Sequence, residues 1–149
     1  MAGLSLENLD FGKRRFYGCN FSHTSMRNVL FKDAVLRMCF FDFAVLESCD
    51  FTGADVQFCS FAGCHISDTT LENCELVHNN FNGAQTRGCA FNCSNLYNSR
   101  FILSEFTATG FVDCNIKKAY FLRTKENNVS FKFSNTLEAV FDAGHEEDL

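Results

Sequence analysis

The sequence predicts an all-β solenoid, and three observations support this fold class. Large apolar residues recur every five positions from Leu6 to Phe141, and small residues stand two places before them. The stretch 49 to 64 shows the rule most clearly, because Cys49, Ala54 and Cys59 precede Phe51, Val56 and Phe61. A period of five fits neither a helix nor a strand, and a repeat that cannot bury its own apolar face must stack on neighbouring repeats. The chain also has no proline, so every backbone N–H is available for a ladder.

Length and composition predict one domain. The chain has 149 residues, 46% hydrophobic content and a net charge of -5, which is enough for one core. The register covers residues 1–143, and the acidic segment 144–149 falls outside it, so we expect that tail to be disordered. There is no long apolar run, signal peptide or lipidation motif, which predicts a soluble, cytoplasmic protein without a membrane partner.

The nine cysteines follow the repeat. Eight occupy the small position, where they alternate with Ala, Ser, Thr and Val: Cys19, Cys39, Cys49, Cys59, Cys64, Cys74, Cys89 and Cys114. Only Cys93 lies elsewhere. This exchange with alanine predicts small buried thiols in a reducing compartment. Cys19, Cys39 and Cys59 form a vertical file, but the spacing lacks the paired cysteines of structural zinc sites, so we expect no metal.

Three-residue units with a small residue, Asp or Asn, and an aliphatic residue recur along the chain. Examples are 54–56 (Ala-Asp-Val), 94–96 (Ser-Asn-Leu) and 114–116 (Cys-Asn-Ile). These units resemble the pentapeptide-repeat proteins over roughly residues 4 to 143. The resemblance implies a right-handed quadrilateral β-helix, with four pentapeptides in each coil and the small and central residues pointing inward.

Sorting the central residues by a period of twenty tests a four-sided coil. One column, from Phe21 to Phe141, contains only phenylalanine, and the column ten residues out of phase, from Phe11 to Phe131, departs from it only at Leu71. The other two columns are largely aliphatic. Large residues on two opposite sides fit a narrow interior at normal packing density. At four pentapeptides a coil, the register gives about seven coils and a rod roughly 30 to 35 Å tall.

The quality of the register varies along the chain. Arg14 intrudes into a small position, so we expect an imperfect first coil; the register is cleanest from residue 19 to 82. Thr86, Glu126 and Thr136 stand at central positions, which predicts looser final coils. No capping element is recognisable at either end. Solenoid ends usually need a cap, so the chain is expected either to be part of a longer protein or to bury a surface in an oligomer.

The sequence contains no recognisable catalytic constellation. There is no nucleophile beside a base, no carboxylate pair and no glycine-rich phosphate loop. The four histidines occupy outward positions or the tail. A regular repeat without long insertions also lacks the usual place for an active site. We therefore expect a protein that is not an enzyme and needs no cofactor.

An acidic belt stands out in the charge pattern. Between Met38 and Thr86 there is no Lys or Arg. The same stretch holds seven acidic residues: Asp42, Glu47, Asp50, Asp55, Asp68, Glu72 and Glu75. Basic residues predominate on both sides of the belt. Two interpretations are open: a solvated surface that keeps the rod in solution, or a mimic of the phosphate charge of a DNA duplex.

A further resemblance bears on this choice. The segment 16–23 and the richness in Cys and Phe are similar to the quinolone-resistance pentapeptide proteins, which bind DNA gyrase and topoisomerase IV as DNA mimics. The resemblance implies a protein partner of that kind and no direct binding of nucleic acid. This chain departs from that group because no loop interrupts the register, no apolar C-terminal dimerisation helix is visible and the acidity is moderate. The pentapeptide domains of secreted bacterial effectors offer an alternative.

Apolar residues at outward positions predict a second contact surface. They gather on one side near the C-terminal end of the rod: Ile102, Leu103, Tyr120, Leu122 and Val140. Exposed apolar patches of this kind mark interaction sites. The sequence leaves open whether this side contacts a second copy in a homodimer or a different protein.

Overall fold

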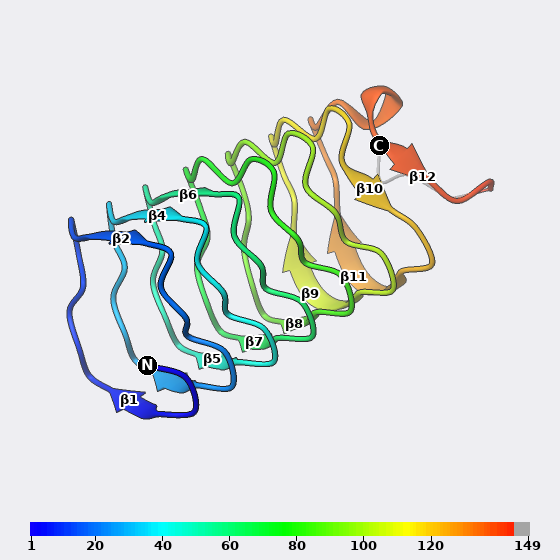
Figure 1. Ribbon diagram of the computed structural model, residues 1–149. Coiled ribbons are helices and arrows are strands. Elements are labelled where there is room, and N and C mark those ends of the chain that lie inside the picture. The colour runs from blue at the N-terminus through cyan, green and yellow to red at the C-terminus, as the bar shows by residue number, and fades with distance from the viewer. Residues whose placement is uncertain (145–149) are drawn as a thin grey trace.

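The computed structural model describes residues 1–144 and shows a rod of stacked coils, with the N-terminus at one end and the C-terminus at the other (Figure 1). Its strands are short, because each side of a coil spans only one repeat. They are β1 (Ser5–Glu7), β2 (Arg15–Tyr17), β3 (Ser25–Arg27), β4 (Val35–Arg37), β5 (Val45–Glu47), β6 (Asp55–Gln57), β7 (His65–Ser67), β8 (Gln85–Arg87), β9 (Glu105–Gly110), β10 (Tyr120–Phe121), β11 (Lys125–Ser130) and β12 (Val140–Phe141). A 3-10 turn, η1 (Thr136–Glu138), interrupts the last coil.

Residues twenty apart lie side by side in parallel sheets. The largest sheet has seven strands in the order β1-β3-β5-β7-β8-β9-β11, one for each coil, and β2-β4-β6 and β10-β12 form smaller sheets on other sides. The register pairs Leu6 with Met26 and Phe16 with Leu36. A repeat distance of twenty means four pentapeptides in each coil. The predicted all-β, four-sided helix of about seven coils is therefore confirmed.

We name the four sides of the rod after the central residues of the first coil. Face A carries Leu6, face B carries Phe11, face C carries Phe16 and face D carries Phe21, and each later coil adds twenty to these numbers. Faces A and B meet at the A/B corner, and faces C and D meet at the diagonally opposite C/D corner. Coils are numbered 1 to 7 from the N-terminus.

The chain turns each corner with a residue in the left-handed region of backbone space. The residue two places after a central residue has a positive φ at almost every repeat, as in Asn8 (54°), Asp33 (59°) and Gly53 (73°). Glycine, asparagine and aspartate adopt this conformation at the lowest cost, which explains their frequency at this position. The corners are thus a consequence of local sequence, and the same position projects its side chain outward.

The core contains two stacks of phenylalanine rings that meet edge to face. On face D, Phe81 and Phe101 lie parallel with ring centroids 4.8 Å apart, and on face B Phe91 and Phe111 do the same. Across the interior, Phe91 meets Phe101 at 88° and 5.9 Å. Both geometries are favourable for aromatic rings. The ring spacing equals the strand spacing, so each added coil extends both stacks.

The small inward residues also hydrogen-bond to the preceding coil. The thiol of Cys64 donates to the carbonyl of Phe41 at 2.7 Å, and that of Cys74 donates to Phe51 at 2.9 Å. The hydroxyls of Ser94 and Ser99 make the equivalent bond to Leu71 and Leu76, both at 2.6 Å. Cysteine and serine thus satisfy buried carbonyls that alanine would leave with one partner fewer.

Two of the irregular positions lie in the terminal coils, and a third is buried. Arg14 is exposed in the first coil, and Glu126 is exposed in β11, the last strand of face A. Thr86 is buried, and its hydroxyl lies 2.7 Å from that of Thr109. Of the tail 144–149, only Gly144 is described, so the expected disorder lies outside the described residues. No helix within residues 1–144 is long and apolar enough to cross a membrane.

Candidate protein-binding surfaces

The acidic belt is distributed over all four faces. Face A carries Glu47 at the end of β5 and Asp68 directly after β7, and face B carries Asp50 and Glu72. Asp55 and Glu75 lie on face C, and Asp42 lies on face D. The predicted contacts therefore do not form one surface. The linear sequence could not separate them, although sorting the outward residues by the twenty-residue period would have done so.

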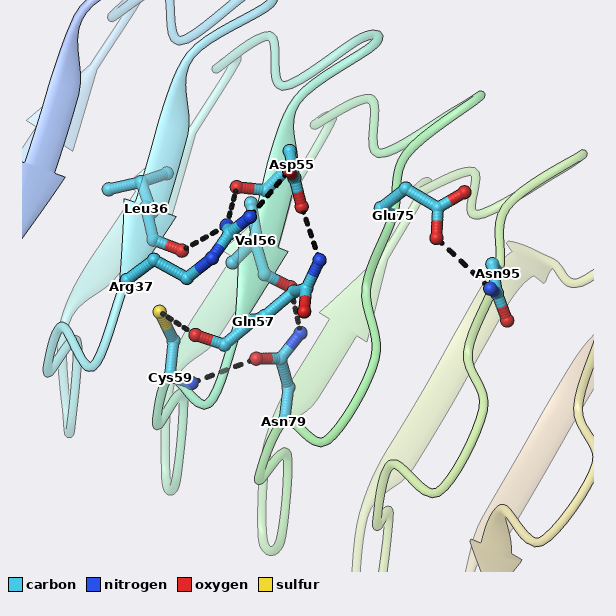
Figure 2. A network of polar contacts seen from close by, with 9 residues as sticks. All are labelled: Leu36, Arg37, Asp55, Val56, Gln57, Cys59, Glu75, Asn79 and Asn95. Carbon is cyan, nitrogen blue, oxygen red and sulfur yellow. Dashed lines mark hydrogen bonds and ion pairs between the residues drawn. The ribbon is translucent and has the colours of Figure 1, made fainter.

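The Asp55 carboxylate accepts hydrogen bonds from other side chains of the rod (Figure 2). Arg37 donates to one carboxylate oxygen at 2.6 Å and to the backbone carbonyl of Asp55 at 2.9 Å, and Gln57 donates to the other carboxylate oxygen at 2.7 Å. Partial burial opposes ionisation of Asp55, but the hydrogen bonds from Arg37 and Gln57 outweigh it and hold its pKa below the usual value. A carboxylate with both oxygens occupied has little left to offer a partner.

Glu75 and Asp42 also differ from free surface carboxylates. Asn95 donates to Glu75 at 3.0 Å across the next coil, as Figure 2 shows. One carboxylate oxygen of Asp42 is buried and has no hydrogen-bond partner within the described residues. These two side chains also lie on different faces, C and D, so they do not add to a common patch.

The remaining four acids gather at the A/B corner. Glu47 and Asp50 belong to coil 3, and Asp68 and Glu72 belong to coil 4 directly above it. Glu47 and Asp68 are exposed, whereas Asp50 and Glu72 are half-buried. Within residues 1–144 none of the four makes an ion pair. We call this group of four carboxylates the acidic corner; it projects outward along one edge of the rod.

The predicted apolar residues share face D. Tyr120 pairs with Val140 in the β10-β12 sheet, and the backbone N–H of Leu103 donates to the carbonyl of Leu122 at 2.9 Å. Leu103 is 60% exposed and Val140 39%, while Ile102, Tyr120 and Leu122 are half-buried. The structure thus brings together the five residues Ile102, Leu103, Tyr120, Leu122 and Val140, which we call the apolar patch. Whether the patch binds a second copy or another protein remains a proposal.

Face D is also bordered by bulky residues at corner positions with a left-handed backbone conformation. Large apolar side chains with positive φ are strained relative to glycine or asparagine. Four of them border face D: Met38 and Phe58 at the C/D corner, and Phe43 and Leu103 at the D/A corner. All four are more than half exposed, so burial does not offset the strain. Such residues are expected at a surface that contacts another molecule.

A hollow of about 520 Å³ opens at the C/D corner beside the apolar patch. We call it the C/D hollow; it is lined by Phe58, His78, Asn79, Asn98, Arg100, Ile102 and Tyr120. Sequence reasoning did not find it. The signal was available, because Phe58 and His78 occupy the same corner position one coil apart and their rings stack at 4.8 Å.

The thiols show no arrangement suited to metal binding. Within the described part of the chain there is no group of three or more metal-ligating side chains close enough to hold an ion. Cys93 is exposed, whereas Cys39 and Cys59 are buried in neighbouring coils, where the N–H of Cys39 donates to the sulfur of Cys59 at 3.4 Å. The hydrogen bond with Cys39 and the burial of the Cys59 thiol both raise the pKa of Cys59. Cys39 and Cys59 thus pack inside the rod.

Comparison with solved structures supports the fold. The chain is similar to the pentapeptide-repeat protein Rfr23 from the cyanobacterium Cyanothece, with a TM-score of 0.55 and 17% identity over 66% of this chain and 64% of that one. Two other structures match more loosely. The plasmid-mediated fluoroquinolone resistance protein QnrB1 has a TM-score of 0.37 and 16% identity over 95% of this chain and 91% of that one. HetL from the cyanobacterium Nostoc has a TM-score of 0.34 and 12% identity over 95% of this chain and 88% of that one. The chain therefore spans less than two thirds of the length of Rfr23.

The family comparison agrees with the register. No curated protein matches the sequence significantly. A family model described as pentapeptide repeats matches in eight copies, with residues 15–53 and 31–68 aligned. The aligned residues 15–68 overlap the part of the chain where the five-residue register is most regular, and the parallel coils continue the same pattern through β12. The chain therefore carries pentapeptide repeats, and its four-sided fold is similar to that of the pentapeptide-repeat protein Rfr23.

Proposed function

We propose that the chain is a protein-binding rod whose acidic corner occupies a basic, DNA-binding surface of a type II topoisomerase, either DNA gyrase or topoisomerase IV. The observation that carries the proposal is the acidic corner itself. Glu47, Asp50, Asp68 and Glu72 project from one edge of a straight rod and have no cationic partner within residues 1–144. The resemblance of segment 16–23 to the quinolone-resistance proteins suggests this class of partner.

The charge density of the corner fits partial mimicry of a duplex. Neighbouring coils are about 4.8 Å apart, so two carboxylates in each coil place roughly one charge every 2.4 Å along the rod. B-DNA carries about one charge for every 1.7 Å of its axis. The similarity extends over only two coils, so the corner replaces a short stretch of phosphates. Binding is expected to be dominated by charge and to weaken as salt is added.

Reversing the charge of the corner tests this function. The variant combines Glu47→Lys, Asp68→Lys and Glu72→Lys with Asp50→Asn. We expect wild-type protein to inhibit gyrase supercoiling more strongly at low than at moderate salt, and the variant to lose at least ten-fold in potency. The measurement is a supercoiling assay on relaxed plasmid, titrated with protein at two salt concentrations.

The chain itself supplies precedents for these substitutions. Arg87 and Lys32 already stand at the positions equivalent to Glu47 and Glu72 in other coils, and Lys118 stands at the corner position of the repeat, as Asp68 does, although at the C/D corner. Asparagine at position 50 keeps the acceptor for the N–H of Thr52. The control reverses Glu105 and Asp113, which lie in coil 6. Equal inhibition by wild-type and corner variant, with both folded by circular dichroism, would rule out the acidic corner as the contact.

A second binding function is favoured by the apolar patch, which leaves Leu103 and Val140 exposed on face D. We expect this patch to support contact with another protein or a second copy of the chain. The double variant Ile102→Asp with Leu122→Asp should then reduce association, since each aspartate would be desolvated at the contact. Sedimentation velocity between 5 and 200 μM, on the order of typical weak dimers, provides the measurement. An unchanged sedimentation coefficient for wild type across this range would exclude self-association.

A further inference from the structure

We infer that the C/D hollow and the adjoining apolar patch bind an acidic peptide segment of a partner protein, with a bulky apolar side chain of that segment seated in the hollow. This inference rests on the second binding function proposed above and names its ligand. It concerns the corner diagonally opposite the acidic corner, so the two surfaces can be tested independently.

The walls of the hollow are shaped for an apolar anchor. On one side the rings of Phe58 and His78 stack at 4.8 Å with an interplanar angle of 11°, and Tyr97 meets His78 edge-on at 5.6 Å. On the other side lie Ile102 and Tyr120. The stacked rings form a flat aromatic wall that is already present without a ligand. A ligand that inserts an aromatic or large aliphatic side chain would therefore bury apolar surface without first ordering the site.

The floor of the hollow accepts an apolar group at little cost. Asn79 is 1% exposed, and both the nitrogen and the oxygen of its side chain make a hydrogen bond. Its amide nitrogen donates to the carbonyl of Val56 at 2.8 Å, and its oxygen accepts from the N–H of Cys59 at 2.9 Å, as seen in Figure 2. Covering a satisfied polar group leaves no unpaired donor or acceptor, which is the usual penalty for burying one.

Positive charges surround the hollow and the apolar patch. Arg100 lines the hollow, Lys118 lies at the C/D corner in the next coil, and Arg123 lies at the D/A corner beside the apolar patch; all three are exposed and make no ion pair within residues 1–144. The nearby acids are already engaged. Glu138 lies 3.7 Å from Lys117, and Asp142 accepts the N–H of Arg123. The complementary ligand is therefore negatively charged beside its apolar anchor.

An acidic peptide fits this surface better than a single-stranded nucleic acid. Nucleic-acid sites combine basic residues with exposed aromatic platforms on which successive bases stack. Here Phe58 already stacks on His78, and the surface continues as the aliphatic residues Ile102, Leu103 and Leu122. Aliphatic side chains provide contacts for Leu, Ile or Phe of a peptide and no platform for a run of bases.

Selection from a random twelve-residue peptide library displayed on phage tests the inference. The wild-type chain is the bait at low salt. We expect the recovered peptides to carry a net negative charge and at least one Phe, Trp, Leu or Ile. Their affinity, measured by fluorescence anisotropy, should fall at least ten-fold for the variant Arg100→Glu with Arg123→Glu and for Ile102→Asp alone.

A matched variant and a nucleic-acid arm make each outcome decisive. Arg87→Glu with Lys132→Glu changes the net charge equally on faces A and B and should leave peptide binding within two-fold of wild type. The inference would be overturned if no peptides, or only neutral or basic peptides, were recovered. It would also be overturned if both charge variants lost peptide affinity equally, or if a twelve-nucleotide oligothymidine bound more tightly than the peptides. The sedimentation result for Ile102→Asp with Leu122→Asp is a separate readout, so a contact between copies could survive that failure.

Discussion

Replacing Phe101 with alanine is expected to lower the free energy of unfolding by about 4 kcal/mol, as for other fully buried phenylalanines. Phe101 is 0% exposed and stacks on Phe81 and Phe121 at 4.8 and 4.9 Å. It also meets Phe91 and Phe111 edge to face. Alanine would leave a cavity in the face D stack, bordered by the rings of face B, that the backbone ladders prevent from collapsing. Urea unfolding followed by circular dichroism measures the change.

Two further substitutions separate the cavity from other causes. Phe101→Leu keeps most of the volume, and Leu71 shows that one coil already accepts leucine at a central position among phenylalanines, so we expect a loss of about 1 kcal/mol. Phe133 is 83% exposed, and Phe133→Ala should change stability by less than about 0.5 kcal/mol. Equal losses for all three variants would contradict a core that depends on ring stacking.

Alkaline pH is expected to destabilise the rod through its buried thiols. Burial raises the pKa of Cys64 and Cys74 from 9.0 to about 12, and that of Cys114 to about 11. Because the pKa is higher in the folded state, the unfolded chain loses these protons first as the pH rises. Their contribution is therefore complete below pH 9 and is lost progressively up to the folded pKa. The three thiols together should lower the free energy of unfolding by about 4 kcal/mol between pH 8 and pH 10.

The matched control removes the titrating groups and keeps the fold. Alanine already occupies the same inward position at Ala34, Ala54 and Ala84, so the triple variant of Cys64, Cys74 and Cys114 to alanine should fold. Urea titrations at pH 8 and pH 10 compare the two proteins. Over this interval the free energy of unfolding is expected to fall by about 4 kcal/mol less for the variant than for wild type. An identical loss in both proteins would mean that these thiols do not titrate on unfolding.

The two predictions differ in how far the sequence alone supports them. The phenylalanine stacks follow from the columns at a period of twenty, because a residue's place in the repeat decides which residue lies above it. The edge-to-face meeting of Phe91 and Phe101 does not follow from the columns, since it depends on the width of the interior. Likewise, the sequence predicts that Cys64 is small and buried but gives no sign of its bond to the carbonyl of Phe41.

The surfaces show the same division. The register was sufficient to place Ile102, Leu103 and Leu122 on one side of the rod. It did not show that Arg37 donates a hydrogen bond to the Asp55 carboxylate, because that contact depends on side-chain conformations in two neighbouring coils. The acidic belt was visible as a stretch of sequence. Only the winding of the chain separated it into three isolated or engaged positions and one group of four at the A/B corner.

The sequence by itself determined the fold class, the four-sided coil, the inward and outward residues and the burial of eight of the nine cysteines at least in part. It could do so because residues that pair in neighbouring coils are always twenty residues apart in the sequence. The tertiary structure alone decided which charges are free, where the C/D hollow opens and which bulky corners remain exposed. These features depend on the shapes and conformations of individual outward side chains, which vary from coil to coil and which no period in the sequence encodes.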